Sequence, residues 1–210
     1  MSEPVENPPV SEREDRRHSN RRLEIIEAAM VLFAERGVEQ VSTRQIAQRV
    51  GISQPSLYAH FATKEALLEE VCTRAFEELS ERMRSVLTGP VTVEQMRNLG
   101  RVYIDFGLER PDAYRIAFMR EHGPPGGAPT GPPLLAGMEA YGLCRNTVVA
   151  LLAGRVSQSR AEIAAQSQWA CMHGLVSLLL SMPEFPWAER DALIGAHLDF
   201  ICAALEASFA

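Results

Sequence analysis

Several features that mark particular protein classes are scarce or missing in this 210-residue sequence. Lysine occurs once, at Lys64, so arginine carries almost all of the positive charge. No run of about 18 apolar residues exists, and the longest candidate, residues 174–182, is about half that length, so we expect no membrane span. The N-terminus is polar and acidic and lacks the apolar core of a signal peptide. These absences predict a soluble cytoplasmic protein.

Metal-binding and catalytic motifs are also missing. The cysteines Cys72, Cys144, Cys171 and Cys202 are widely spaced and form no CxxC pair or Cys/His cluster, so we expect reduced thiols and neither metal nor cofactor. The sequence has no GxSxG motif and no phosphate-binding loop. An enzyme built around His173 remains an alternative, but no nucleophile is placed near that residue. We therefore expect no catalytic residues and no enzymatic activity.

Charge is distributed unevenly along the chain. The net charge is −6, yet residues 16–64 hold eight basic and four acidic side chains, a net of +4. Residues 1–15 carry −4 and residues 65–210 carry −6. A basic segment inside an acidic chain predicts one anion-facing surface, although chance placement explains any single charge equally well.

Apolar residues recur at helical spacing throughout, and no alternation typical of strands is seen. This pattern predicts an all-α protein with nine helices, over about 20–35, 43–50, 54–61, 64–87, 93–109, a short helix from Pro111, 134–153, 159–181 and 188–208. Ser42, Thr63, Thr92 and Ser159 are the expected N-terminal caps of four of them. Residues 122–133 form a Gly/Pro-rich loop.

Residues 1–19 carry proline, serine and alternating charges with almost no apolar side chain. Such a segment cannot bury enough surface to offset the cost of ordering, so we expect a flexible N-terminal arm. Its arginines suggest an arm that enters a DNA minor groove. A solvated tail is the alternative.

Residues 42–67 organise the rest of the chain. Ser42 and Gln45 fit a capping box, Gly51 permits the positive φ of a tight turn, and Pro55 suits the first turn of a second helix. The segment therefore predicts a short helix, a turn, a second short helix and the start of a long third one.

The polar residues of this segment suit a DNA-binding helix-turn-helix. Small hydrogen-bonding side chains and helix-start amides are what contact phosphates and base edges. The candidate DNA-binding residues are Thr43, Arg44, Ser53, Gln54, Pro55, Ser56, Tyr58, His60 and Lys64. Each alone is also explained as a solvated surface side chain.

The pattern TRQIA, then GIS, then LYxHFxxK over residues 43–64 resembles the N-terminal domain of the tetracycline-repressor (TetR) family. The resemblance covers about residues 22–70. It implies a nine-helix TetR-like fold, with an N-terminal three-helix DNA-binding domain and a C-terminal bundle that binds an effector and dimerises. It also implies that most of the candidate residues contact phosphates. Arg44 and Pro55 lie at positions that vary in the family, so the operator sequence stays open.

In the C-terminal half, Trp169-x-x-x-His173-Gly174 resembles the WHG-type subgroup of the family. The effector pocket that this implies is expected to involve Tyr103, Phe106, Tyr114, Phe118, Met119, Trp169 and His173. A core tryptophan and a hydrogen-bonded core histidine are the alternative interpretation. Gly174 is expected to allow close helix approach, because a mid-helix glycine otherwise costs about 1 kcal/mol against alanine.

These expectations combine into one hypothesis. Residues 1–19 are the arm, 20–71 the DNA-binding domain, and 72–210 the effector-binding and dimerisation domain. The protein would be a homodimeric repressor, paired through its last two helices and released from a pseudo-palindromic double-stranded DNA operator by a small molecule. The alternatives are a helical small-molecule-binding protein, or an activator of the same fold.

Overall fold

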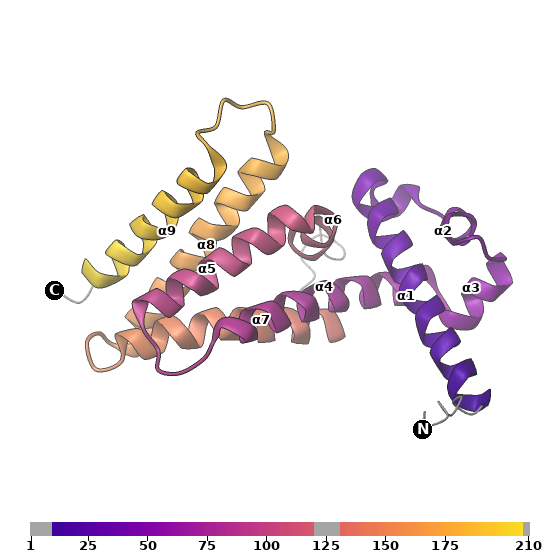
Figure 1. Ribbon diagram of the computed structural model, residues 1–210, viewed down its shortest axis with the longest axis horizontal. Coiled ribbons are helices and arrows are strands. Elements are labelled where there is room, and N and C mark those ends of the chain that lie inside the picture. The colour runs from indigo at the N-terminus through magenta and orange to yellow at the C-terminus, as the bar shows by residue number, and fades with distance from the viewer. Residues whose placement is uncertain (1–9, 120–130, 208–210) are drawn as a thin grey trace, which may run out of the picture. The chain divides into compact units, whose positions relative to one another are not determined.

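The computed structural model describes residues 10–119 and 131–207 and divides the chain into two compact units, Met1–Val71 and Cys72–Ala210. The described residues form nine α-helices, one 3₁₀ turn and one π-helical turn, without a β-strand (Figure 1). The all-α prediction is therefore confirmed. None of the described helices is long and apolar enough to cross a membrane.

The first unit contains α1 (Val10–Arg36), the 3₁₀ turn η1 (Val38–Gln40), α2 (Thr43–Val50), α3 (Gln54–His60) and the start of α4 (Lys64–Val86). Contacts link α1 with α2 and α2 with α3. The core consists of apolar side chains that recur at helical spacing, among them Ile26, Met30, Phe33, Ile46, Leu57 and Leu67. Packing of this shared core holds two helices that are too short to be stable alone.

Helix α1 corrects the prediction of a flexible arm over residues 1–19. It begins at Val10 rather than near Asn20, so residues 10–19 are helical, and residues 1–9 lie outside the described part. Arginine and glutamate are good helix formers, and a packed helix extends without a new nucleation cost. Contact between the rings of His18 and His60, whose centroids are 4.2 Å apart, ties the added turns to the unit.

The second unit contains the rest of α4, α5 (Val93–Glu109), α6 (Pro111–Tyr114), the π-helical turn η2 (Arg115–Met119), α7 (Pro132–Leu152), α8 (Gln158–Ser181) and α9 (Arg190–Ala207). Helix α5 packs against α7, α8 and α9 (Figure 1). Its position beside three helices explains why Leu99, Tyr103 and Phe106 are almost completely buried.

Two local predictions in this unit are wrong. The cap of α8 is Ser157, whose Oγ accepts from the amide of Arg160, rather than Ser159. Ser159 therefore lies inside the first turn of α8, and both carboxylate oxygens of Glu162 accept from the Arg145 guanidinium.

The close helix approach occurs at Gly107 and not at Gly174. A Cβ built on Gly174 would meet nothing within 4 Å, whereas one on Gly107 would lie 2.4 Å from Cγ1 of Val176. Helix α5 therefore reaches α8 at a point where only glycine fits.

Candidate functional site

The α2–turn–α3 segment forms as its capping residues predict. Ser42 Oγ accepts from the amide of Gln45, and the Gln45 side chain accepts from the amide of Ser42, so the capping box is complete. Gly51 ends α2 with φ 75°, in the left-handed region. Ser53 caps α3 by accepting from the amide of Ser56. The capping hydrogen bonds and the turn at Gly51, together with packing in the core, therefore fix the angle between α2 and α3.

A buried hydroxyl links the two helices. Thr43, only 8% exposed, accepts a hydrogen bond from Nε2 of Gln54 at 3.0 Å, and its Oγ1 lies 3.1 Å from the Tyr58 hydroxyl. Thr43, at the start of α2, is therefore in contact with two residues of α3, Gln54 and Tyr58. Sequence patterns predicted these residues as separate polar side chains, and the structure brings them together.

The other candidate residues of this segment differ in exposure. Arg44, Ser53, Pro55 and Tyr58 are exposed, while Gln54, Ser56, His60 and Lys64 are half-buried. The exposed set lies at the start of α2 and along α3. These four residues and the half-buried Ser56, which precedes Leu57 on α3, are called the α2–α3 surface below.

His60 lies at the end of α3 against α1. Burial, followed by the nearby charges of His18 and Arg22, lowers the pKa of His60 below its usual 6.5. Arg22 donates to the carbonyl oxygen of His60 at 2.9 Å, pairs with Glu70 at 3.0 Å, and lies 4.1 Å from the ring centroid of Phe61. The histidine therefore belongs to a packed junction as much as to the surface.

Lys64 also has internal partners. Its ammonium donates to the carbonyl oxygens of Val38 and Val41, at 3.0 and 3.2 Å. These carbonyls follow α1, so the only lysine of the chain fastens the start of α4 to the segment that precedes α2. One N–H of the ammonium is left for a further acceptor.

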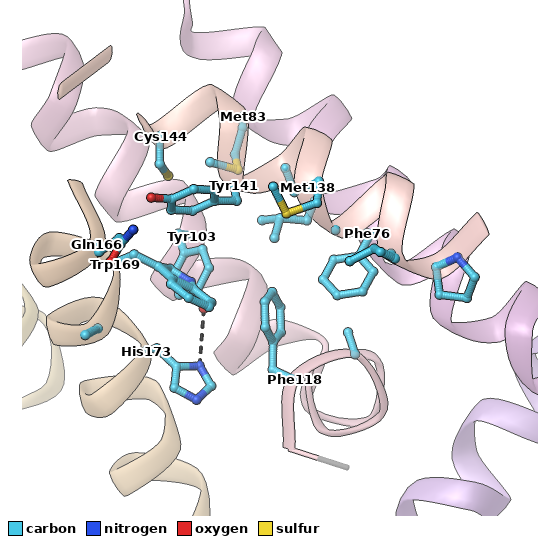
Figure 2. Close-up of a pocket in the computed structure, with 17 residues that line it drawn as sticks. Phe76, Met83, Tyr103, Phe118, Met138, Tyr141, Cys144, Gln166, Trp169 and His173 are labelled. Carbon is cyan, nitrogen blue, oxygen red and sulfur yellow. Dashed lines mark hydrogen bonds between the residues drawn. The ribbon is translucent and has the colours of Figure 1, made fainter. Parts of the chain in front are cut away.

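The second unit contains a half-open cavity of about 630 Å³ between α4, α5, η2, α7 and α8 (Figure 2). That volume is typical of pockets for small organic molecules. Most of the wall is apolar or aromatic. It is lined by Phe76, Leu79, Met83, Tyr103, Ala117, Phe118, Pro133, Leu134, Gly137, Met138, Ala140, Tyr141, Cys144, Gln166, Trp169, Ala170 and His173.

Four of the residues predicted for a pocket line this cavity, namely Tyr103, Phe118, Trp169 and His173. The other three lie outside its lining. Phe106 is a fully buried core side chain of α5, and the Met119 side chain is 41% exposed. The Tyr114 hydroxyl lies 2.6 Å from Nδ1 of His173 but does not line the cavity. Sequence reasoning missed the wall from α7, including Met138 and Tyr141, because the weakly amphipathic sequence of α7 does not show which side faces α8.

A chain of hydrogen bonds links three residues of the cavity wall with Tyr114 and Ser177. Nε1 of Trp169 donates to the Tyr103 hydroxyl at 3.3 Å, which lies 3.1 Å from the Tyr114 hydroxyl. The Tyr114 hydroxyl lies 2.6 Å from Nδ1 of His173, whose Nε2 lies 3.3 Å from Oγ of Ser177. We call these five residues the Trp169–Ser177 chain.

Burial keeps the groups of this chain uncharged. It raises the pKa of Tyr103 well above its usual value, raises the pKa of Tyr114 to about 12, and lowers that of His173 below 6.5. Within the described residues, no three His, Cys, Asp or Glu side chains are grouped to hold a metal ion.

Family models match both halves of the chain. Residues 25–71 match the model described as "Bacterial regulatory proteins, tetR family", and residues 96–201 match the "Tetracyclin repressor-like, C-terminal domain". The chain belongs to the TetR family. Membership of this family of regulators confirms the prediction that the protein is not an enzyme.

The TetR relatives with curated names are similar over only part of the chain. The transcriptional repressor KstR2 of Rhodococcus jostii is 38% identical over 69 residues, which are 33% of this chain and 34% of that protein. The uncharacterized regulator YobS of Bacillus subtilis is 29% identical over 98 residues, covering 47% and 51%. The chain thus spans about half or less of the length of the curated relatives it matches.

A solved TetR structure is similar over most of the chain. The TetR-family regulator from Streptomyces coelicolor superimposes with a TM-score of 0.68 at 25% identity, covering 90% of this chain and 81% of that one. A TetR variant from Acinetobacter baumannii, solved with minocycline, gives 0.58 at 24% identity, covering 89% and 96%. The two likenesses confirm the TetR fold.

Proposed function

We propose that this protein is a ligand-responsive transcriptional regulator that binds double-stranded DNA, and more specifically a repressor. The observation that carries the proposal is the capped α2–Gly51–α3 segment with its exposed polar α2–α3 surface. Helix-turn-helix proteins place the second of two such helices in the major groove. Similarity to proteins named as repressors supports the sign of regulation.

Within this proposal the candidate residues divide into two roles. Arg44, Ser53, Pro55, Ser56 and Tyr58 are accessible enough to contact phosphates or base edges. Thr43 and Gln54 hold α3 against the start of α2, and so position the contacting residues. His60 and Lys64 add a histidine and a free ammonium N–H at the edge of this surface.

The proposed effector site is the 630 Å³ cavity of the second unit. A similarly folded TetR variant was solved with minocycline, which supports small-molecule binding in this bundle. Trp169, His173 and Gly174 also share the pattern of the WHG-type subgroup, to which we assign the C-terminal half. We place the protein in the cytoplasm, where it meets DNA.

Helix α4 is the proposed route of coupling. It contributes Lys64 to the first unit and Phe76, Leu79 and Met83 to the cavity wall of the second. A ligand that contacts Phe76 therefore contacts the helix whose first residue is bonded beside α2. The ligand shifts the DNA-bound population only by its differential affinity for the two states.

We propose a homodimer formed through α8 and α9. Ile163, Leu178 and Phe200 on these helices are 63%, 46% and 71% exposed, which is unusual for large apolar side chains. Ile163 and Phe200 line a groove of about 370 Å³ together with Arg160, Ser167 and Cys171. Pairing of α8 and α9 with a second copy would bury this surface and would supply two DNA-binding segments for a pseudo-palindromic operator.

The decisive experiment is operator selection followed by titration. Duplexes enriched from a random pool by the full chain are measured by fluorescence anisotropy at rising salt. We expect sequence-selective binding whose affinity falls steeply with salt, because phosphate contacts release counterions. Arg44→Ala should weaken it, whereas Arg190→Ala, a matched loss of charge at the start of α9, should not. Failure to enrich any sequence would refute DNA regulation.

Repression is tested separately. A reporter placed behind the enriched operator should be expressed less when the protein is present. Increased expression would identify an activator of the same fold. Unchanged expression together with ligand binding in the cavity would favour a ligand-binding protein without regulatory action.

A further inference from the structure

The polar groups of the Trp169–Ser177 chain are satisfied by one another. One arrangement of protons gives each donor of the Trp169–Ser177 chain an acceptor: Trp169 donates to Tyr103, Tyr103 to Tyr114, and Tyr114 to Nδ1 of His173. Nε2–H of His173 then donates to Ser177. The chain runs in one direction and ends on a hydroxyl, so it presents few unused hydrogen-bonding groups to a ligand. Outside this chain, the polar side chains of the wall are Gln166 and Tyr141, whose hydroxyl is buried without a hydrogen-bond partner among the described residues.

The wall also carries no charge in the part of the chain that the structure describes. Its lining residues include neither Asp, Glu, Lys nor Arg, and its ionisable groups are tyrosines, one cysteine and His173. Burial raises the pKa of Cys144 to about 12 and lowers that of His173, so both are neutral near pH 7. A ligand charge placed here would lose its hydration without gaining a partner of opposite charge.

Aromatic rings and thioethers line the cavity beside its aliphatic side chains. Trp169 lies between Tyr141 and His173, with ring centroids 5.5 and 6.1 Å away. Phe118 packs edge-on against Phe76 at 5.0 Å. Figure 2 shows these rings and the sulfur of Met138 around the same space. Flat rings are well matched by such faces and by the polarisable sulfur.

We propose that this cavity binds an uncharged, largely apolar ring compound and excludes carboxylate and ammonium ligands of the same shape. The proposal rests on the proposed function only in taking this cavity as the effector site. It names the ligand class by what the described lining residues offer, namely apolar area and ring faces, with no counter-charge among them.

Three probes with one skeleton test the charge rule: 4-acetylbiphenyl, biphenyl-4-carboxylate and 4-(aminomethyl)biphenyl. Binding is measured by the fluorescence of Trp169 in a Trp187→Phe background, with calorimetry as a second readout. Trp187 is suitable for removal because it lies outside the cavity, between α8 and α9. We expect the ketone to bind at least about 100-fold more tightly than the acid or the amine, since an unpaired buried charge costs several kcal/mol.

A charge-compensation variant tests the cause. Met138 lines the cavity, yet it is 56% exposed, so Met138→Lys should be tolerated. We expect this variant to bind the carboxylate at least about 10-fold more tightly than wild type, with little change for the ketone. Met138→Gln, which is neutral and of similar length, is the matched control and should leave the preference unchanged.

The state of the hydrogen-bond chain has its own readout. Nitrogen NMR of His173 should show a neutral ring protonated on Nε2 at pH 7.5, and ring assignment is made with His173→Gln. An imidazolium, or a neutral ring protonated on Nδ1, would overturn the proposed chain.

Each result decides one proposal. Equal affinity for the ketone and the acid, or no binding of any of the three probes, would overturn the ligand class while leaving DNA regulation intact. If the ketone binds but operator affinity is identical with and without it, the cavity is not the regulatory site, and the ligand class stands.

Discussion

The hydroxyl of Tyr58 lies 3.1 Å from Oγ1 of Thr43, across the turn that separates α3 from α2. Gln54 donates to the same oxygen. Because the partner is buried, this contact holds an exposed aromatic side chain in one orientation before any DNA is bound. The α2–α3 surface is therefore preorganised, which reduces the entropy lost on binding.

Tyr58→Phe tests this preorganisation. The change removes one hydrogen bond and one possible phosphate donor, so operator affinity should fall about 5- to 30-fold, equivalent to roughly 1–2 kcal/mol. The free energy of unfolding in urea should change by less than about 1 kcal/mol, because Tyr58 is 45% exposed. Tyr141→Phe, the same chemical change in the other unit, should leave DNA affinity unaltered. Equal effects of the two variants would contradict the assignment.

Lys64→Met should lower stability as well as DNA binding. It deletes the two hydrogen bonds from the ammonium to the carbonyls of Val38 and Val41, which at about 1.5–3 kcal/mol each for a charged donor predicts a loss of a few kcal/mol. Thermal and urea unfolding measure that loss. Lys64→Arg should retain part of the stability that Lys64→Met loses. A variant as stable as wild type would show that these carbonyls find water equally well.

Replacing either of two glycines on neighbouring helices with alanine should change the free energy of unfolding, and the two changes should have opposite signs. Gly107→Ala places a Cβ 2.4 Å from Val176, so we expect a loss of about 1–3 kcal/mol from overpacking. At Gly174 a Cβ meets nothing within 4 Å, so Gly174→Ala should stabilise α8 by up to about 1 kcal/mol. Urea denaturation of both variants, followed by helical circular dichroism, distinguishes them. A shift of the same sign in both would contradict the packing.

Acid should destabilise the second unit partly through His173. Burial holds its folded pKa below the usual 6.5, so between these two values the unfolded chain binds more protons than the folded one. Stability is then lost as the pH falls below about 6.5 toward the folded pKa, and it is fully present above that window. His173→Gln should flatten the decline of the urea midpoint between pH 7.5 and 5. An unchanged slope would assign the acid sensitivity to other groups.

Phe200→Asp should yield monomers if α8 and α9 pair with a second copy. Phe200 and Leu135 are each 71% exposed, but only Phe200 lines the groove beside α8. Leu135→Asp on α7 is therefore a matched control that should leave the assembly intact. Sedimentation velocity at several concentrations gives the masses. A dimer that survives Phe200→Asp would move the interface elsewhere.

Local signals in the sequence predicted the first unit closely. Ser42 and Gly51 act through atoms at most a few residues away, so their roles as cap and turn follow from spacing alone. Ser157 shows the limit of this approach. The rival pattern at Ser159 failed because the cap of α8 lies two residues earlier, where Ser157 Oγ accepts from the amide of Arg160. Glu162 pairs instead with Arg145 on another helix, a contact that spacing does not reveal.

The cavity was predicted only in part for the same reason. Trp169 and His173 share a face of α8, which periodicity shows, but the apolar sequence of α7 gives no preferred face. The position of Gly107 rather than Gly174 at the close approach depends on which turns of α5 and α8 meet. Such choices are made by tertiary packing, and they decide which apolar residues line a pocket and which fill the core.

The internal hydrogen bonds of the Trp169–Ser177 chain affect how the ligand preference of this protein can change through substitution. Since its polar groups bond with one another, the other walls of the cavity, including Leu79, Met83 and Leu134, contribute shape without belonging to that chain. Exchanges among leucine, methionine and phenylalanine at these positions alter the outline of the space at little cost in folding. Ligand preference is thus free to drift, or to be redirected by directed evolution for biosensors, while the hydrogen-bonded scaffold stays constant.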